Sequence, residues 1–261
     1  MMLDLDLALA LSEAQLWLWQ GFVVFLRVGA IIALAPAFGE EAVPPRIKLV
    51  VALGFTLIVL PGVAGQIGPP PASFIARLGY CGAEVMAGLL FGLLIRIFVM
   101  VLQIAGTIAA QAASISQLFG GSAGAEPQPA IGHLLVTAGL ALAVMAGLHV
   151  QLAAYLLHGY VLVPPGTLPD AGTALEVGLE GIARGFGLAF SLAAPFVAAA
   201  LLYNLILGII NRAMPQLMVT FVGAPALTLG GLLLLMLAAP PMLALWSDAL
   251  SRFLAAPFAG P

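Results

Sequence analysis

The sequence predicts an all-α, polytopic integral membrane protein with about six hydrophobic helices arranged as helical hairpins. Of its 261 residues, 63% are hydrophobic and 7% are charged, whereas about 25% of the residues in a typical soluble domain are charged. The mean hydropathy is +1.17, so there are too few polar side chains to cover a single water-soluble core. Continuous apolar runs exceed the roughly 20 residues that a helix needs to cross a bilayer, which favours helices over the alternating strands of a barrel.

Six spanning helices fit these apolar runs. They are predicted at residues 15–38, 47–65, 84–111, 131–157, 185–211 and 218–245. We expect one membrane domain over residues 1–261, with an N-terminal helical part (1–163), a connector (164–184) and a C-terminal helical hairpin (185–247). The opening residues carry acids where a secretory signal carries basic residues, so no cleaved signal peptide is expected. The single cysteine, Cys81, excludes an internal disulfide.

The stretch GEEAVPPRIK at residues 39–48 concentrates charge between the first two runs. It contains Glu40, Glu41, Arg46 and Lys48 beside Pro44. Proline resists helix continuation, and charged side chains are costly inside hydrocarbon. We therefore predict a polar hairpin turn here.

A second polar turn is predicted between the last two runs, in the sequence NRAMPQLM at residues 211–218. Arg212, Pro215 and Gln216 take the corresponding places there. In the connector, Thr173 and Glu176 match the S/T-x-x-E capping box. Apolar side chains follow at helical spacing, so a short amphipathic helix is predicted, either as an interfacial connector or as a partner site.

The third run carries a polar stripe, because its polar residues fall within roughly an 80° sector of one helix face. The stripe consists of Arg96, Gln103, Thr107, Gln111 and Ser114. Polar groups at membrane depth face a bundle interior, a subunit or a water-filled path. Two interpretations follow, hydrogen bonding to neighbouring helices or the wall of a conduit. Arg27, deep in the first run, requires buried pairing or snorkelling for the same reason.

Two further patterns concern helix packing and depth. Gly88 and Gly92 form a GxxxG motif on the third run, which allows another backbone to approach closely. Trp17, Trp19 and Trp246 lie near predicted span ends, where an interfacial aromatic belt is expected.

Residues 111–129 follow the polar stripe and are rich in Gly and Ser. Irregular backbone at membrane depth is tolerated only inside protein or along an aqueous cavity. This loop is therefore expected either to leave the membrane or to fill a pore. Residues 120–124 spell G-x-S-x-G, but the strand-turn-helix setting of a hydrolase elbow is missing.

Other chemistry is not indicated by the sequence. The three histidines lack a metal-binding spacing, so we expect no metal, no cofactor and no enzyme activity. Eight basic residues and a net charge of −3 argue against nucleic-acid binding.

Taken in order, three motifs make the chain similar to the FliR-type export-gate proteins of bacterial flagellar type III secretion, called SctT in injectisomes. The resemblance covers nearly the whole chain. The first motif runs from Arg27 through PAFG (36–39) and VP (43–44) to RIK (46–48). The second joins Arg212 to PQL (215–217) and VGAP (222–225). The third is the polar loop followed by a His-containing helix that ends in VPPG (163–166).

The resemblance implies a structural, pore-forming subunit of the export gate in the bacterial inner membrane, within the flagellar basal body. It implies FliP- and FliQ-type gate subunits, FlhA- and FlhB-type components and unfolded export substrates as partners. It also implies that the loop after the third run is a pore plug. The plug candidates are Ile115, Gln117, Leu118, Phe119, Gly120 and Gly121. The alternative is a small-solute transporter or channel, for which internal two-fold similarity is expected.

Overall fold

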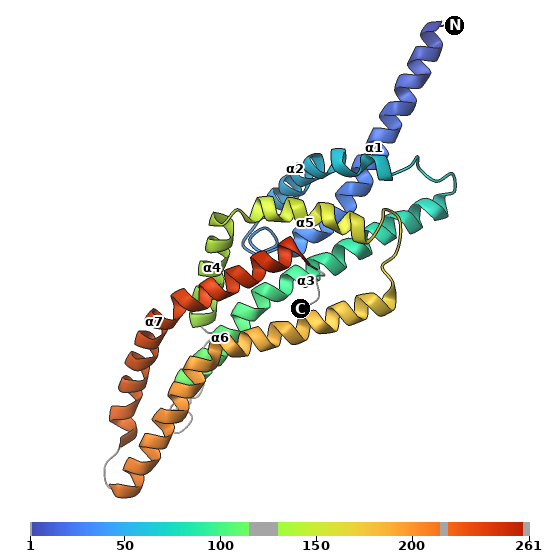
Figure 1. Cartoon of the computed structure of the whole chain (residues 1–261). Coiled ribbons are helices and arrows are strands. Elements are labelled where there is room, and N and C mark those ends of the chain that lie inside the picture. Colours follow the sequence, from blue (N-terminus) through green and yellow to red (C-terminus); the bar gives the residue numbers. More distant parts are fainter. Residues whose placement is uncertain (1, 115–129, 215–218, 258–261) are drawn as a thin grey trace. The chain divides into compact units, whose positions relative to one another are not determined.

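The computed structural model describes residues 2–114, 130–214 and 219–257, and every regular element in those ranges is a helix (Figure 1). The predicted all-α fold class is therefore confirmed for this part of the chain. The α-helices are α1 (Met2–Leu34), α2 (Pro45–Val63), α3 (Phe74–Ser114), α4 (Ala130–Met145), α5 (Leu148–Leu162), α6 (Ala171–Ala213) and α7 (Val219–Ala255). A 3₁₀ helix, η1 (Ala64–Gln66), follows α2 directly.

The chain divides into two compact units. Unit 1 contains residues 1–96, 146–180 and 251–261, and unit 2 contains residues 97–145 and 181–250. Helices α1, α2 and α5 belong to unit 1, and α4 belongs to unit 2. The long helices α3, α6 and α7 contribute residues to both units.

Within the described residues, five helical segments are long and apolar enough to cross a membrane. They cover residues 10–34, 45–66, 74–112, 171–213 and 229–255. The predicted fourth span at 131–157 is not one continuous helix, because the helix is interrupted between α4 and α5. Gly147 lies in this break with a φ of 81°, in the left-handed region that ends a right-handed helix. The pair α4 and α5 makes a sixth span only if it is taken as one broken span.

The predicted polar turn between the first two runs is confirmed. Residues 35–44 connect α1 to α2, and the side chains of Glu41 and Arg46 are exposed. Pro44 is the N-cap of α2, and Pro45 is its first residue. Proline suits this position because the first N–H groups of a helix have no partner within the helix. The two prolines therefore start α2 as well as ending the turn.

In unit 1, α1 and α3 approach each other at the GxxxG motif. A Cβ atom added to Gly88 would lie 2.6 Å from the carbonyl oxygen of Arg27 and 2.7 Å from the Cβ of Ala30. At Gly92 it would lie 3.0 Å from the side chain of Leu34. The predicted close backbone approach is confirmed, and the contacting helix is α1.

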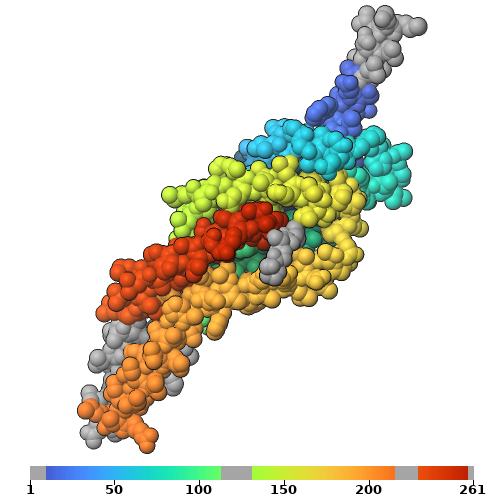
Figure 2. All heavy atoms as spheres, in the orientation of Figure 1, coloured from blue at the N-terminus to red at the C-terminus, as the bar shows by residue number. Residues whose placement is uncertain are grey.

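Helix α2 lies on the surface of unit 1 beside α5 (Figure 2). Its outer face is apolar, with Val50, Leu57 and Ile58 all more than half exposed. On the inner side, the buried amide of Gln20 on α1 donates hydrogen bonds to the carbonyl oxygens of Ala64 (3.0 Å) and Ile67 (2.8 Å). The outer face of α2 is thus apolar, and the polar side chain of Gln20 is hydrogen-bonded inside unit 1. A membrane protein requires that its polar groups be satisfied internally in this way.

In unit 2, small residues and one tryptophan join the helices. Gly106 on α3 packs directly against Gly132 on α4. Trp246 on α7 is fully buried, and its indole N–H donates a 2.7 Å hydrogen bond to the carbonyl oxygen of Phe98 on α3. The predicted interfacial position is therefore wrong for Trp246, because its ring fills the core of unit 2. Trp17, in contrast, is 56% exposed.

The predicted amphipathic connector is not a separate helix. Residues 171–184 form the first turns of α6, which continues without interruption to Ala213. The N-cap also differs from the predicted capping box. The carboxylate of Asp170 accepts hydrogen bonds from the backbone N–H (2.8 Å) and the hydroxyl (2.9 Å) of Thr173. Asp170 therefore begins the helix, because its oxygen reaches the N–H three residues ahead.

Candidate functional site

Among the described residues, unit 1 contains a buried ion pair. Arg27 on α1 and Glu84 on α3 are both fully buried. Arg27 Nε donates to Glu84 Oε2 at 2.8 Å, and Arg27 Nη2 donates to Glu84 Oε1 at 3.0 Å. Two parallel charge-assisted bonds fix the relative positions of the two side chains more strictly than one bond would.

The third nitrogen of the Arg27 guanidinium, Nη1, binds the C-terminal end of α5. Arg27 Nη1 donates to the carbonyl oxygens of Val163 (2.7 Å) and Gly159 (3.3 Å). Val163 is the C-cap residue of α5, and its backbone N–H donates a 3.0 Å hydrogen bond to the Gly159 carbonyl oxygen. Carbonyl groups at the end of a helix carry partial negative charge, which favours a cation beside them. The Arg27 Cζ atom also lies 4.0 Å from the ring centroid of Tyr160, within the range of a cation–π interaction.

The carboxylate of Glu84 holds the loop that follows α5. Its Oε1 accepts a 2.7 Å hydrogen bond from the backbone N–H of Gly166. Its Oε2 lies 3.5 Å from the Tyr160 hydroxyl, which donates to it. The Arg27–Glu84 cluster therefore ties together α1, α3, α5 and the loop after α5. The two charges neutralise each other, and both side chains make further hydrogen bonds. These interactions offset the free-energy cost of burying the charges.

Of the two predicted alternatives for Arg27, buried pairing or snorkelling, the structure shows buried pairing. The sequence did not identify its partner: Glu84 is the first residue of the predicted span 84–111, but no motif links it to Arg27, 57 residues earlier. Two signals were present. Glu84 is the only acid on α3, and it lies four residues before Gly88, on the helix face that contacts α1.

A second ionic cluster fixes the turn between α1 and α2. Arg96 Nη1 donates a 2.7 Å bond to Glu40 Oε1, and both side chains are about a quarter exposed. Lys48 Nζ donates to the carbonyl oxygen of Gly39 at 2.9 Å. Glu40, Lys48 and Arg96 thus act together at this turn, while Arg46 points away as an exposed side chain.

The exposed polar row lies on α3 in unit 2. Gln103 and Gln111 are exposed, and Thr107 between them is half-buried. The Thr107 hydroxyl donates a 2.8 Å hydrogen bond to the carbonyl oxygen of Gln103. Arg96 takes part in the ion pair with Glu40, so the polar row consists of these three side chains. Ser114 is the last residue of α3, and its side chain is not among those that the structure describes.

The other predicted site residues divide into two groups. Arg212 lies in the last turn of α6 and is exposed. Pro215 and Gln216 lie outside the described residues. The plug candidates Ile115, Gln117, Leu118, Phe119, Gly120 and Gly121 also lie outside them.

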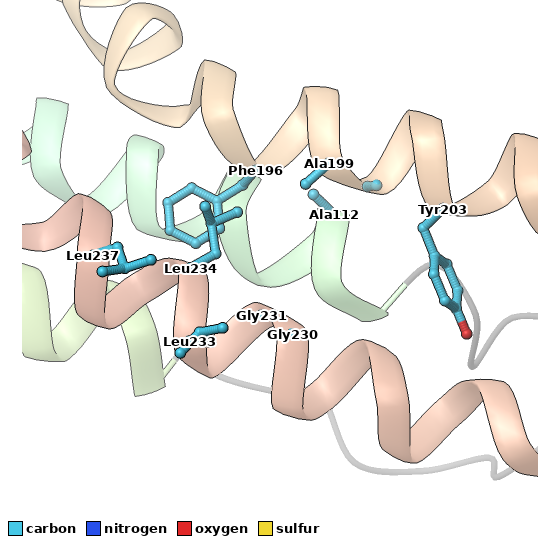
Figure 3. Close-up of a pocket in the computed structure, with 10 residues that line it drawn as sticks. Ala112, Phe196, Ala199, Tyr203, Gly230, Gly231, Leu233, Leu234 and Leu237 are labelled. Carbon is cyan, nitrogen blue, oxygen red and sulfur yellow. The ribbon is translucent and has the colours of Figure 1, made fainter.

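Unit 2 contains an apolar cavity of about 300 Å³ between α3, α6 and α7 (Figure 3). Ala112 closes one side, Phe196 and Ala200 come from α6, and Leu234 and Leu237 come from α7. The lining is almost entirely hydrocarbon, so the cavity offers shape but no reactive group. The hydroxyl of Tyr203 is the one side-chain polar atom that Figure 3 shows among the lining residues.

The cap of α6 provides a pH-dependent prediction. The Thr173 backbone N–H and hydroxyl hold the pKa of Asp170 below its ordinary value of 3.8. A lowered pKa means that the cap stabilises the helix above that ordinary value and is lost as pH falls through the lowered one. In peptide-resolved hydrogen exchange, the protection factor of residues 171–176 is expected to be constant from neutral pH to about pH 4 and to fall below it.

The matched control is Asp170→Asn, which keeps an oxygen acceptor but cannot titrate. It is expected to cap the helix with no pH-dependent change in protection. If Asp170→Asn and the unchanged chain lose protection in parallel, the Asp170 carboxylate is not the titrating group.

The long apolar helices, together with charges that are paired inside the chain, define a multi-pass membrane protein. Comparison with known proteins identifies its family. The chain belongs to the bacterial export proteins, family 1, whose sequence pattern matches residues 18–253.

Curated relatives agree with this assignment. The flagellar biosynthetic protein FliR of Caulobacter vibrioides is 31% identical over 227 residues, which cover 87% of this chain and 90% of the relative. FliR of Escherichia coli K12 is 29% identical over 87% of each chain. FliR of Bacillus subtilis 168 is 30% identical over 78% of this chain and 79% of the relative. The resemblance to FliR-type proteins is therefore confirmed, and the chain is a multi-pass membrane component of the flagellar export apparatus.

Proposed function

We propose that this chain is a structural, pore-forming subunit of the flagellar type III export gate, and that it helps unfolded substrates to cross the inner membrane. The observation that carries the proposal is the exposed polar row on α3. Gln103, Thr107 and Gln111 present amide and hydroxyl groups on residues 97–112 of α3, a stretch that is otherwise apolar. Such groups are unfavourable against lipid, so they favour a place beside water or another polypeptide.

The surface of unit 2 supports a place in a larger assembly. Helix α6 exposes a series of large apolar side chains that only lipid or another apolar protein surface can cover. They include Leu201, Leu202, Leu205, Ile206 and Ile209, each more than half exposed. We propose FliP- and FliQ-type gate subunits as the neighbours that cover part of this surface, with FlhA- and FlhB-type components beside them.

The plug remains a prediction from the resemblance. Segment 115–121 connects directly to the end of α3, so it follows the polar row along the chain. A plug at this position would close the same path that the row is proposed to line.

A deletion strain tests the function. Loss of the chain is expected to abolish secretion of flagellar filament protein into the medium, measured by immunoblot, and re-expression is expected to restore it. In mild detergent, the chain is expected to co-purify with other small helical membrane subunits. Normal secretion without the chain would refute the proposal. Purification as a lone homo-oligomer, combined with altered solute uptake in the deletion strain, would favour the small-solute transporter instead.

A further inference from the structure

We infer that Gln103, Thr107 and Gln111 form a binding strip for the backbone of an extended polypeptide, which they recognise through its peptide groups rather than its side chains. This inference rests on the proposed function and specifies how the conduit wall meets its substrate. Three properties of the row carry it: its hydrogen-bonding chemistry, its spacing and its lack of charge.

The row offers the chemistry that a peptide backbone complements. The side-chain amide of Gln103 carries donors and an acceptor, and within the described residues it makes no hydrogen bond. The Thr107 hydroxyl uses its O–H to donate a hydrogen bond to the Gln103 carbonyl oxygen, so its oxygen lone pairs remain to accept. A peptide group has one N–H donor and one C=O acceptor. Gln103 can therefore meet both, and Thr107 can accept from an N–H.

The spacing of the row matches an extended chain. Successive members are four residues apart on a helix, which places them about 6 Å apart along the axis. An extended polypeptide repeats every two residues, or about 6.6 Å. Over the whole row, from Gln103 to Gln111, about 12 Å of helix faces about four residues of extended chain. Alternate peptide groups of a passing chain thus come within reach of successive row members.

The row is also electrically neutral. Residues 97–112 of α3 contain no Asp, Glu, Lys or Arg. A fixed charge at this depth would attract one class of segment and repel the other, since Coulomb interactions are strong where water is scarce. Neutral amide and hydroxyl groups neither attract nor repel charged segments by net charge. Acidic and basic segments of a substrate can therefore pass the same wall.

Cross-linking tests the geometry of this strip. The single native cysteine, Cys81, is first replaced by alanine, which leaves a cysteine-free chain. Gln103→Cys and Gln111→Cys are then labelled separately with a thiol-directed photo-cross-linker in the assembled gate. An export substrate fused to a domain that cannot unfold is used to stall in the conduit. The cross-linked substrate residues are mapped by mass spectrometry.

The expected result is that both positions label the substrate, and that the two labelled sites differ by about four residues. A substrate that passes as a helix would give a difference of about eight residues, which would overturn the inference. A stalled substrate that is present in the gate but labelled from neither position would also overturn it. If no substrate stalls in a gate containing this chain, the proposed function itself fails.

Secretion assays test the chemistry independently. The double variant Gln103→Leu/Thr107→Val is expected to lose most secretion while the chain still assembles with its partner subunits, and Gln103→Asn/Thr107→Ser is expected to restore it. Met100→Leu, on the same helix and 48% exposed, is the control and is expected to secrete normally. Normal secretion by the double variant would overturn the inference. Failure of that variant to assemble would assign the row to a subunit contact instead.

The charge of the strip is tested with paired substrates that differ only in one acidic or basic segment. Gln103→Glu is expected to slow the acidic substrate selectively, and Gln103→Lys is expected to slow the basic one. Equal effects of both variants on both substrates would contradict a strip that faces the passing chain.

Discussion

Replacing Arg27 with methionine is expected to destabilise unit 1 by about 3–5 kcal/mol, the cost of removing one partner of a buried ion pair. The change leaves the Glu84 carboxylate buried without its counter-charge, and it removes the Nη1 group that donates to the Gly159 and Val163 carbonyl oxygens. The midpoint of thermal unfolding of the purified full chain in mild detergent measures this loss. The amount of folded chain in membranes is expected to fall with it.

The double variant Arg27→Met/Glu84→Leu separates charge from packing. Removing both charges is expected to cost less than the sum of the two single changes, because no lone charge remains in the interior. The matched control is Arg96→Met, which breaks the partly exposed pair with Glu40 and is expected to cost at most about 1 kcal/mol. A loss for Arg27→Met no larger than that for Arg96→Met would show that the buried cluster does not hold unit 1 together.

Two glycines on α3 are expected to respond to alanine in opposite directions. At Gly88 a methyl group would meet the Arg27 carbonyl oxygen at 2.6 Å and the Ala30 Cβ at 2.7 Å. Helices α1 and α3 must then separate, and such overpacking costs about 1–3 kcal/mol. Gly88→Ala is therefore expected to lower the unfolding midpoint, and the longer side chain of Gly88→Leu is expected to lower it further.

Gly82, six residues earlier on α3, is the control. A Cβ atom there meets nothing within 4 Å, and alanine favours a helix over glycine by up to about 1 kcal/mol. Gly82→Ala is expected to leave the midpoint unchanged or to raise it slightly. If both alanine variants shift the midpoint in the same direction, helix propensity rather than close packing governs these positions.

Features that depend on local sequence were predictable. Long apolar runs specify spanning helices, and the charges and prolines at residues 40–48 specify a turn, because hydrocarbon rejects both charge and unpaired backbone. The GxxxG motif at Gly88 and Gly92 specified a close approach, although the motif alone could not name α1 as the partner. The exposed position of Gln103 and Gln111 also agrees with the predicted stripe.

Features that depend on distant partners were not predictable in the same way. Glu84 follows Arg27 by 57 residues, and only the folded packing of α1 on α3 brings the two together. Trp246 is apolar with one donor, so its sequence position near a span end suits an interface as well as a core. Asp170 and Thr173 are both residue types that are preferred as helix N-caps. Which of them caps α6 depends on the residue at which the helix begins. The break at Gly147 depends on the left-handed conformation of that residue, and nothing in the sequence distinguishes it from the other glycines.

The contacts of Arg27 also impose an order on biosynthesis. When α1 leaves the ribosome, its guanidinium has no counter-ion, because Glu84 is made 57 residues later and the Val163 carbonyl group 136 residues later. An unmatched arginine at the centre of a helix opposes membrane insertion by about 2.5–3.5 kcal/mol. We therefore expect the first helix to reach its final depth only after the third has been translated.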